Sequence, residues 1–212
     1  FLGRYSQKEI PKEAGFRWDA QAKRWATHDP DVARRLKGIA DDAALAALAA
    51  FAASTAETVE ASRKTSSKNN FPSPDGLEYL DFQRAGIEFI TSRRHTLLAD
   101  EMGLGKTVMA IGACNADVDC RKVLVICPSS LRLNWRNEFS RWLTKKMSVG
   151  IAGGSYPADA DIVIVSYDGV KKHHKHLTSK DFDLLIVDEA HYLKNQKAQR
   201  TKHVLGFNPR RG

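Results

Sequence analysis

The pattern of apolar and polar positions from Leu77 onward alternates between two periodicities. Short runs of β-branched and other apolar residues are separated by segments with helical spacing. Such runs are typical of buried strands, and strands that alternate with helices predict βαβ units whose parallel sheet is covered on both faces. The predicted strands are His95–Ala99, Lys122–Cys127, Asp161–Ser166 and Asp183–Val187, and the predicted helices begin at Lys106, at Leu131, after Asp168 and after Gln196.

Residues 1–37 follow a different pattern, in which aromatic and basic residues are interleaved. Gly15–Trp18 and Lys23–Ala26 are predicted to form two short strands joined by a polar turn. Asp29 and Pro30 then predict a helix start, because an aspartate suits the N-cap and proline suits the first helical position. We therefore expect a small α+β module here.

Residues 38–74 are predicted to connect this module to a larger domain over residues 75–212. Ala43–Ala53 consists almost entirely of alanine, leucine and phenylalanine, which favours a helix. The polar stretch Ser62–Asn70 and the prolines that follow it predict a flexible linker. A tether with no chemistry of its own is the simplest interpretation of this region.

Composition and charge narrow the functional class. The chain has a formal net charge of +8 and a pI of about 9.4, which favours a polyanionic partner without indicating a fold. Its three cysteines include no CxxC pair, so a reducing intracellular compartment is expected: cytoplasmic for a prokaryotic or viral source, nuclear for a eukaryotic one. No leader is expected, and no apolar run approaches the roughly 20 residues that span a bilayer, so we expect no membrane partner.

Asp100–Thr107 has the features of a phosphate-binding loop between a strand and a helix. Backbone N–H groups around Gly103, Leu104 and Gly105 would converge on phosphate oxygens, and the helix N-terminus adds partial positive charge. Lys106 would reach the β- and γ-phosphates and Thr107 would hold Mg²⁺. Aspartate at position 100 replaces the usual first glycine, so a chance turn remains the alternative for this pattern taken alone.

An acidic pair follows the last predicted strand. Ligands bind beyond the carboxyl ends of parallel strands, which is where Asp188 and Glu189 are expected. Asp188 is predicted to hold Mg²⁺ and Glu189 to polarise the attacking water as a general base. His191 is a candidate contact to the nucleotide. Two acidic residues that merely end a strand are the alternative.

Several segments together resemble the first motor lobe of the Swi/Snf-type family within helicase superfamily two. The aspartate at the start of the phosphate loop is a trait of that family. The matching segments, in the family's order, are Leu80–Gly86, Asp100–Thr107, Val125–Leu131 with Trp135, Ile164–Tyr167, Asp188–His191 and Leu193–Asn195.

The resemblance implies a RecA-like α/β fold, ATP·Mg²⁺ as cofactor, and ATP-driven tracking along duplex or branched DNA without conventional strand separation. It implies that Gln83 reads the adenine edge. It also implies that a second lobe supplies arginine fingers, so that this chain alone would bind nucleotide weakly and hydrolyse it slowly or not at all. The residues it assigns to the DNA backbone, where sequence-independent contacts are made, are Pro128, Ser129, Ser130, Ser166 and Tyr167.

Two further features of the sequence have a bland and a functional interpretation. The basic runs at 132–146 and 171–176 are either solvated faces or sequence-blind DNA contacts. The aromatic residues of the first module are either its small core or a stacking surface for nucleic acid. Gly15–Asp19 and Lys23–Trp25 weakly resemble the HARP-type module of annealing helicases.

Two other functional classes stay open at this point. An RNA helicase of the same superfamily also carries Asp-Glu-Ala-His, although the form of the phosphate loop and Leu193–Asn195 argue against it. A non-catalytic nucleic-acid-binding module that kept the fold is the second, and intact Lys106, Thr107, Asp188 and Glu189 argue against that one.

Overall fold

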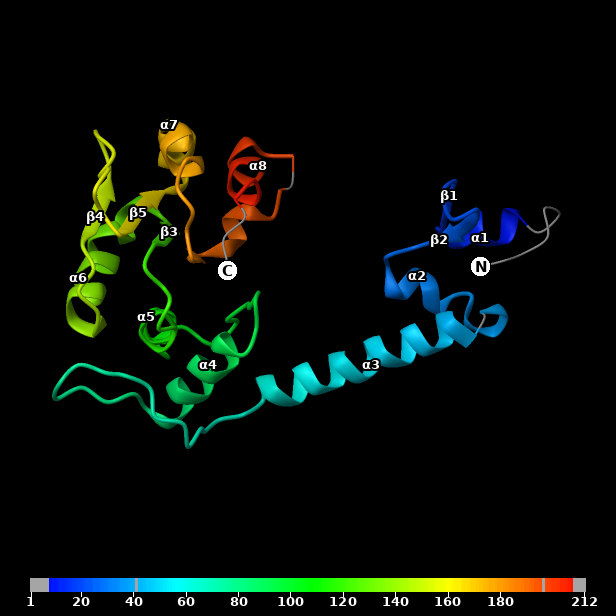
Figure 1. Cartoon of the computed structure of the whole chain (residues 1–212), viewed down its shortest axis with the longest axis horizontal. Helices are drawn as coiled ribbons and strands as arrows, with labels where there is room; N and C mark the ends of the chain where they lie inside the picture. Colours follow the sequence, from blue (N-terminus) through cyan, green and yellow to red (C-terminus); the bar gives the residue numbers. More distant parts are fainter. Residues whose placement is uncertain (1–7, 41, 196, 208–212) are drawn as a thin grey trace. The chain divides into compact units, whose positions relative to one another are not determined.

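The computed structural model describes residues 8–40, 42–195 and 197–207, and the chain divides into two compact units at Arg63–Lys64 (Figure 1). The expected connecting region 38–74 is therefore shared between them, because its helix belongs to the first unit and its polar stretch to the second.

The first unit begins with a helix and the predicted hairpin. Helix α1 (Glu9–Ala14) precedes strands β1 (Arg17–Asp19) and β2 (Arg24–Ala26), which pair antiparallel. The turn is stabilised by Asp19, whose carboxylate accepts hydrogen bonds from two following backbone amides. The hairpin is thus confirmed.

Two helical segments and a long helix complete the first unit. Asp29 caps α2 (Pro30–Arg34) as predicted, with its carboxylate accepting from two backbone amides of the first turn. The 3-10 turn η2 (Lys37–Ile39) leads into α3 (Asp42–Ser62), which extends the predicted alanine-rich helix. No residue of α3 is buried.

Helix α3 differs from the expectation that no apolar run approaches the length needed to span a bilayer. An 18-residue window of this 21-residue helix has a mean hydropathy of 1.2, so by length and composition alone the helix is apolar enough to cross a membrane. Ten of its residues are alanine, with only Leu45, Leu48, Phe51 and Val59 as larger apolar side chains. Such a helix is weak evidence for a membrane span.

The second unit is built on a four-stranded parallel sheet in the order β4-β5-β3-β6, which confirms the predicted α/β fold (Figure 1). The predicted strands at 122–127, 161–166 and 183–187 are present as β3, β5 and β6, and β4 was not predicted. The elements are α4 (Asp81–Thr91), α5 (Lys106–Ala116), β3 (Val123–Cys127), η3 (Ser129–Leu131), α6 (Arg132–Trp142), β4 (Val149–Ala152), β5 (Ile162–Ser166), α7 (Tyr167–Thr178), β6 (Leu184–Val187), η4 (Ala190–Leu193) and α8 (Gln199–Leu205).

Alternate side chains of the strands enter two apolar cores, one on each face of the sheet. Val125 and Ile164 are fully buried in the core that includes α4, α5 and α6. Their neighbours Leu124 and Val163 point into the other core, against α7 and α8. Burial on both faces explains why these strands are continuous apolar runs in the sequence.

The predicted strand His95–Ala99 is wrong: this segment has no strand conformation. A strand needs a neighbour for its backbone N–H and C=O groups, and among the described residues β6 is an edge of the sheet and pairs only with β3. Segment 95–99 and the free edge of β6 instead face each other across a cavity, described below.

Pro72, in the segment predicted as a flexible linker, is held within the second unit through its carbonyl oxygen. Tyr79 donates to the carbonyl oxygen of Pro72 at 3.0 Å, and the amide of Asn115 donates to the same carbonyl, to the Tyr79 hydroxyl and to the carbonyl of Trp142. The Asn115 side chain also accepts from the amide of Thr144. This buried asparagine therefore joins three segments.

Candidate nucleotide site and DNA-facing edge

The loop before α5 has the backbone geometry that its glycines predict. Gly103 and Gly105 have φ angles of 89° and 75°, a region that residues with a Cβ rarely adopt. A Cβ at position 105 would also lie 2.6 Å from Nε2 of Gln83. Both glycines are therefore required by the conformation, and α5 begins directly after the second one.

Lys106 folds back over this loop. Its ammonium donates to the carbonyl oxygens of Asp100 at 2.8 Å and Glu101 at 3.0 Å. A lysine ammonium has three donors, so two of them satisfy loop carbonyls in this state. The side chain thus lies at the loop whose amides are predicted to cradle phosphates.

The acidic pair lies at the carboxyl end of β6. The Asp188 amide donates to the carbonyl of Ile126 at 2.8 Å, which continues the sheet pairing to the start of the turn. One oxygen of its carboxylate, Oδ2, accepts a hydrogen bond from the indole of Trp135 at 2.8 Å. Within the described part of the chain its other oxygen has no donor.

Glu189 is a strained position. Its φ of 53° and ψ of 50° are left-handed, an uncommon conformation for a residue that is not glycine, and such strain clusters at functional sites. Its carboxylate lies 3.1 Å from Nδ1 of His191. The predicted general base and the predicted nucleotide contact are therefore paired at the surface.

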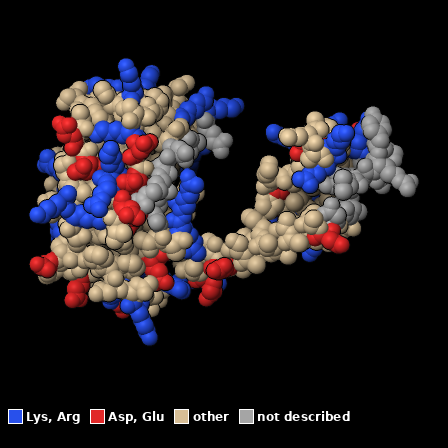
Figure 2. Space-filling model, in the orientation of Figure 1, with Lys and Arg blue, Asp and Glu red and all other residues tan. Residues whose placement is uncertain are grey.

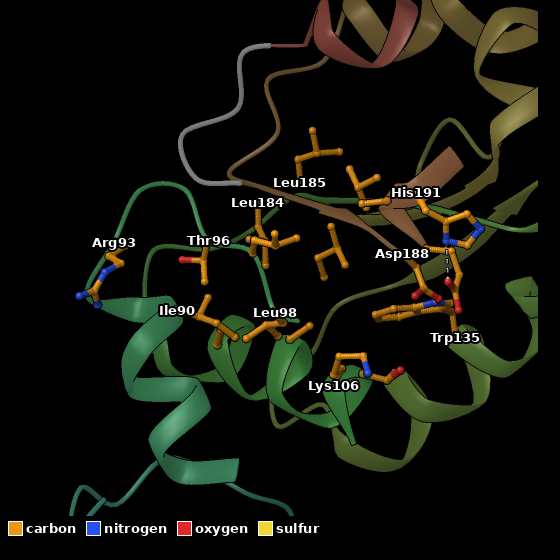
Figure 3. A pocket seen from close by; sticks show the side chains of 18 of the residues that line it. Ile90, Arg93, Thr96, Leu98, Lys106, Trp135, Leu184, Leu185, Asp188 and His191 are labelled. Carbon is orange, nitrogen blue, oxygen red and sulfur yellow. Dashed lines mark hydrogen bonds and ion pairs between the residues drawn. The ribbon is translucent and has the colours of Figure 1, made fainter. Parts of the chain in front are cut away.

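A cavity of about 460 Å³ brings the main predicted residues together. Figure 3 shows Lys106, on α5, on one side and Asp188 and His191, at the end of β6, on the other, with Trp135 beside Asp188. The opposite end of the cavity is lined mainly by the apolar side chains of Ile90, Leu98, Leu184 and Leu185, with Arg93 and Thr96 beside them. The predicted residues in its wall are Lys106, Thr107, Asp188, Glu189 and His191.

Gln83 does not line this cavity, although it contacts the predicted phosphate loop. Its Nε2 donates to the carbonyl of Leu104 at 3.4 Å, and its Oε1 accepts from the amide of Leu80 at 3.1 Å. Both ends of the amide are therefore engaged by protein in this conformation. Its predicted contact with adenine stays a prediction.

The residues predicted to contact DNA follow strands β3 and β5 at the edge of the sheet where Asp188 lies. Ser129 and Ser130 are exposed and Pro128 is half-buried. Ser166 is buried and caps α7 by accepting from the amide of Gly169, and Tyr167 is 4% exposed. All five side chains share one edge, but only the β3 loop presents its hydroxyls to solvent.

Tyr167 supports the acidic turn. Its hydroxyl donates to the carbonyl of Asp188 at 2.5 Å, and its ring stacks on Tyr192 at 5.1 Å. Burial, followed by the negative charge of Asp188, raises the pKa of Tyr167 well above its usual range. This link, like the one from Trp135, joins residues far apart in sequence, and sequence reasoning missed both.

Cys127, the last residue of β3, is close enough to Asp188 to be affected by its charge. All three cysteines are free and buried. Burial, with a smaller contribution from the charge of Asp188, raises the pKa of Cys127 to about 12. Its thiol is therefore neutral and unreactive at physiological pH.

The predicted basic runs do not form a continuous basic surface on the visible face of the second unit (Figure 2). Figure 2 shows lysine and arginine side chains interspersed with aspartate and glutamate on the visible face of the second unit. Lys145, in the first run, uses its ammonium to bind the carbonyls of Asp117 and Cys120.

The aromatic residues of the first unit differ in their exposure. Phe16 and Trp25 line a cavity, whereas Trp18 is 54% exposed. Tyr5 and Arg4, which belong to the same aromatic and basic pattern, lie outside the described residues.

Comparison with known proteins decides the family. The SNF2-related domain matches residues 82–211, which is more than half of the chain. The chain belongs to the SNF2-related domain family. The Swi/Snf-type resemblance noted in the sequence is confirmed, and the matched region contains the phosphate loop, the acidic turn and the strand-end loops between them.

Several proteins are similar to this SNF2-related chain. The SWI/SNF-related matrix-associated actin-dependent regulator of chromatin subfamily A-like protein 1 of Bos taurus is 42% identical over 130 residues, covering 58% of this chain and 14% of that protein. Helicase swr1 of Schizosaccharomyces pombe is 31% identical over 217 residues, covering 85% and 16%. The DNA annealing helicase and endonuclease ZRANB3 of Bos taurus is 33% identical over 156 residues, covering 62% and 14%. The chain thus spans about a sixth or less of these relatives.

The fold is also found in solved structures. The Sulfolobus solfataricus SWI2/SNF2 ATPase core in complex with dsDNA aligns with a TM-score of 0.54 at 22% identity, covering 66% of this chain and 31% of that one. The same core solved as a domain gives 0.55 at 22% identity, covering 69% and 32%. These likenesses confirm the RecA-like fold of the second unit.

Proposed function

We propose that this chain is the nucleotide-binding lobe of an ATP-dependent DNA translocase. The observation that carries the proposal is the convergence of Lys106, Thr107, Asp188 and Glu189 on one cavity at the carboxyl edge of the parallel sheet. These four residues come from two elements about 80 positions apart. Ligand sites in such sheets lie at this edge.

The residues present suit a nucleotide triphosphate with Mg²⁺. Magnesium prefers oxygen ligands, which the Thr107 hydroxyl and the free carboxylate oxygen of Asp188 supply. A bound phosphate would replace the carbonyls that the Lys106 ammonium now contacts, and would receive stronger charge-assisted hydrogen bonds. Mg²⁺ would supply charge neutralisation at the γ-phosphate.

Glu189 is proposed as the residue that orients and deprotonates the attacking water. Its carboxylate is exposed and already paired with His191 at 3.1 Å, so the imidazole would hold it in position and could respond to the nucleotide. Hydrolysis at a useful rate would need an arginine finger from a second lobe, which is worth roughly 10³–10⁵ in rate in related enzymes.

We propose that the chain moves along DNA. Ser129 and Ser130, on the loop after β3, would contact the DNA phosphate backbone, and Pro128 would fix the conformation of that loop. Ser166 and Tyr167, being buried, would act by positioning this edge. Relatives whose names describe chromatin regulation and DNA annealing, and a solved core in complex with dsDNA, favour duplex DNA over RNA. An intracellular location, nuclear in a eukaryote, belongs to the same proposal.

The first unit is proposed to bind DNA through the exposed indole of Trp18. This ring lies edge-on to Trp25, with 5.8 Å between the two ring centroids. Stacking of such an aromatic on unpaired bases would suit a remodelling or repair enzyme that meets branched DNA. The weak HARP-type resemblance points the same way.

Binding of a fluorescent ATP analogue with Mg²⁺ and ATPase assays with duplex DNA or RNA test the proposal. Lys106→Ala is expected to weaken nucleotide binding at least about tenfold, because the ammonium pairs with phosphate. Glu189→Gln is expected to bind nucleotide normally and to abolish hydrolysis in the full-length protein. Nucleotide binding unaffected by Lys106→Ala, or stimulation by RNA but not DNA, would contradict the proposal.

A further inference from the structure

Two side chains of α7, one cationic and one imidazole, converge on the turn that follows β4. We call Gly153–Ser155 the β4 turn. Lys172 donates to the carbonyl oxygens of Gly153 at 3.1 Å and Gly154 at 3.0 Å. Nε2 of His173, which is buried, bonds to the carbonyl of Gly153 at 3.1 Å. The carbonyl groups of Gly153 and Gly154 are therefore both directed at side chains of α7.

Two of the three amide groups of the same turn remain available. The amide of Gly153 donates to the carbonyl of Ser155 within the turn. Across the described residues, the amides of Gly154 and Ser155 have no acceptor, and both residues are exposed. A turn with two carbonyls bound by side chains of α7 and two free amides presents positive potential to solvent, which is the arrangement that binds anions.

Arg132 connects this turn to the β3 loop. Its guanidinium donates to the hydroxyl of Ser129 at 3.1 Å, to the carbonyl of Ser129 at 3.1 Å and to the carbonyl of Ala152, just before the turn, at 3.3 Å. Strands β3, β4 and β5 are parallel, so their carboxyl ends share one edge. The β4 turn therefore extends the edge at which Ser129 is proposed to meet DNA.

We propose that the β4 turn binds a backbone phosphate of duplex DNA next to the phosphate bound at Ser129. The free amides of Gly154 and Ser155 would hold the phosphate oxygens. The Lys172 ammonium uses two donors on the turn and keeps a third for the phosphate. This inference rests on the proposed function. It adds to the strand-end loops a contact made by backbone amides, to which Lys172 of the basic run at 171–176 contributes.

The glycine at position 154 offers a steric probe that leaves charge unchanged. A Cβ at Gly154 would meet no atom within 4 Å, and the residue is outside the positive-φ region, so a larger side chain fits the folded chain. The same side chain would occupy the space through which a phosphate reaches the amides. Gly154→Val is therefore expected to impair DNA binding without destabilising the unit.

Lys172→Gln, with Lys171→Gln and Lys175→Gln as controls, separates a specific contact from general charge. All three lysines are exposed on α7, so each variant lowers the net charge by one. Binding of a fluorescein-labelled duplex is measured by anisotropy at several salt concentrations, and thermal unfolding is followed by circular dichroism. Ser129→Ala is included as a variant of the neighbouring loop.

The expected result is a loss of affinity of about fivefold for Lys172→Gln and for Gly154→Val, equal for duplexes of unrelated sequence, with unchanged unfolding. The slope of log K against log salt should fall by about 0.9 for Lys172→Gln, as for one lost phosphate contact. The two control lysine variants should stay within about twofold of the parent chain.

Two possible results distinguish failure of the β4-turn inference from failure of the proposed function. If the parent chain binds DNA and Ser129→Ala weakens binding, while Gly154→Val and Lys172→Gln behave like the controls, the β4 turn is a structural clamp and this inference fails alone. If neither the parent chain nor the full-length protein binds duplex DNA, the proposed function fails with it.

Discussion

The hydrogen bond from Trp135 to Asp188 predicts that one substitution will affect both the stability of the chain and the proposed Mg²⁺ site. Trp135→Phe keeps an aromatic ring in a position that is 2% exposed and removes only the indole N–H and part of the ring. A hydrogen bond to a charged group contributes about 1.5–3 kcal/mol when buried. Because Asp188 is half-buried and partly screened by water, we expect about 1–2 kcal/mol from the lost bond.

A matched control accounts for the effect of the smaller ring on stability. Trp142→Phe changes the same residue type on the same helix, where the indole is 8% exposed and stacks on Tyr79 at 5.3 Å. Urea unfolding followed by circular dichroism gives the free energy of unfolding for each variant. A double-mutant cycle with Asp188→Asn then isolates the coupling between the indole and the carboxylate.

The functional readout is the Mg²⁺ dependence of nucleotide binding. Without the indole the Asp188 carboxylate can rotate, so Trp135→Phe should require more Mg²⁺ for half-maximal binding of an ATP analogue, whereas Trp142→Phe should not. The reasoning is refuted if the cycle gives a coupling near zero and the Mg²⁺ requirement of the two variants is the same.

Two further predictions concern stability. Asn115→Ala should lower the free energy of unfolding by about 3–5 kcal/mol in urea, because it leaves the buried carbonyl of Trp142 and amide of Thr144 without partners; a loss below about 1 kcal/mol would contradict the role given to Asn115. Cys127 holds its proton in the folded chain, where its pKa is about 12, while the unfolded thiol titrates near 9.0, so the stability it contributes is complete below pH 9 and lost between 9 and 12. The parent chain should therefore lose more stability from pH 8 to pH 10 than Cys127→Ala, and equal losses would contradict the raised pKa.

Local chemistry determined most of what could be predicted from the sequence. The strands β3, β5 and β6 are recognisable because burial on both faces requires unbroken apolar runs. The start of α2 was predictable because the Asp29 carboxylate caps it. Strand β4 was missed because it is short and contains Gly150, whose missing side chain admits Pro157, where a Cβ would approach to 2.5 Å.

Features that depend on distant segments could not be predicted. Segment 95–99 has a strand-like composition, yet no strand among the described residues pairs with it. The contact between Trp135 and Asp188 spans 53 positions, and the clamp of Lys172 on the β4 turn spans 18 and 19. Such pairs depend on which loops the sheet order brings to one edge, and no local pattern carries that information.

The open edge of β6 has a practical consequence for work with this chain. Its backbone is paired on one side only within the described residues, and its side chains Leu184–Val187 are apolar. An apolar strand with unpaired amides and carbonyls is a template for a strand of another molecule. Self-association that rises with concentration is therefore expected of the isolated 212-residue chain, and light scattering should precede any measurement of its affinity for DNA.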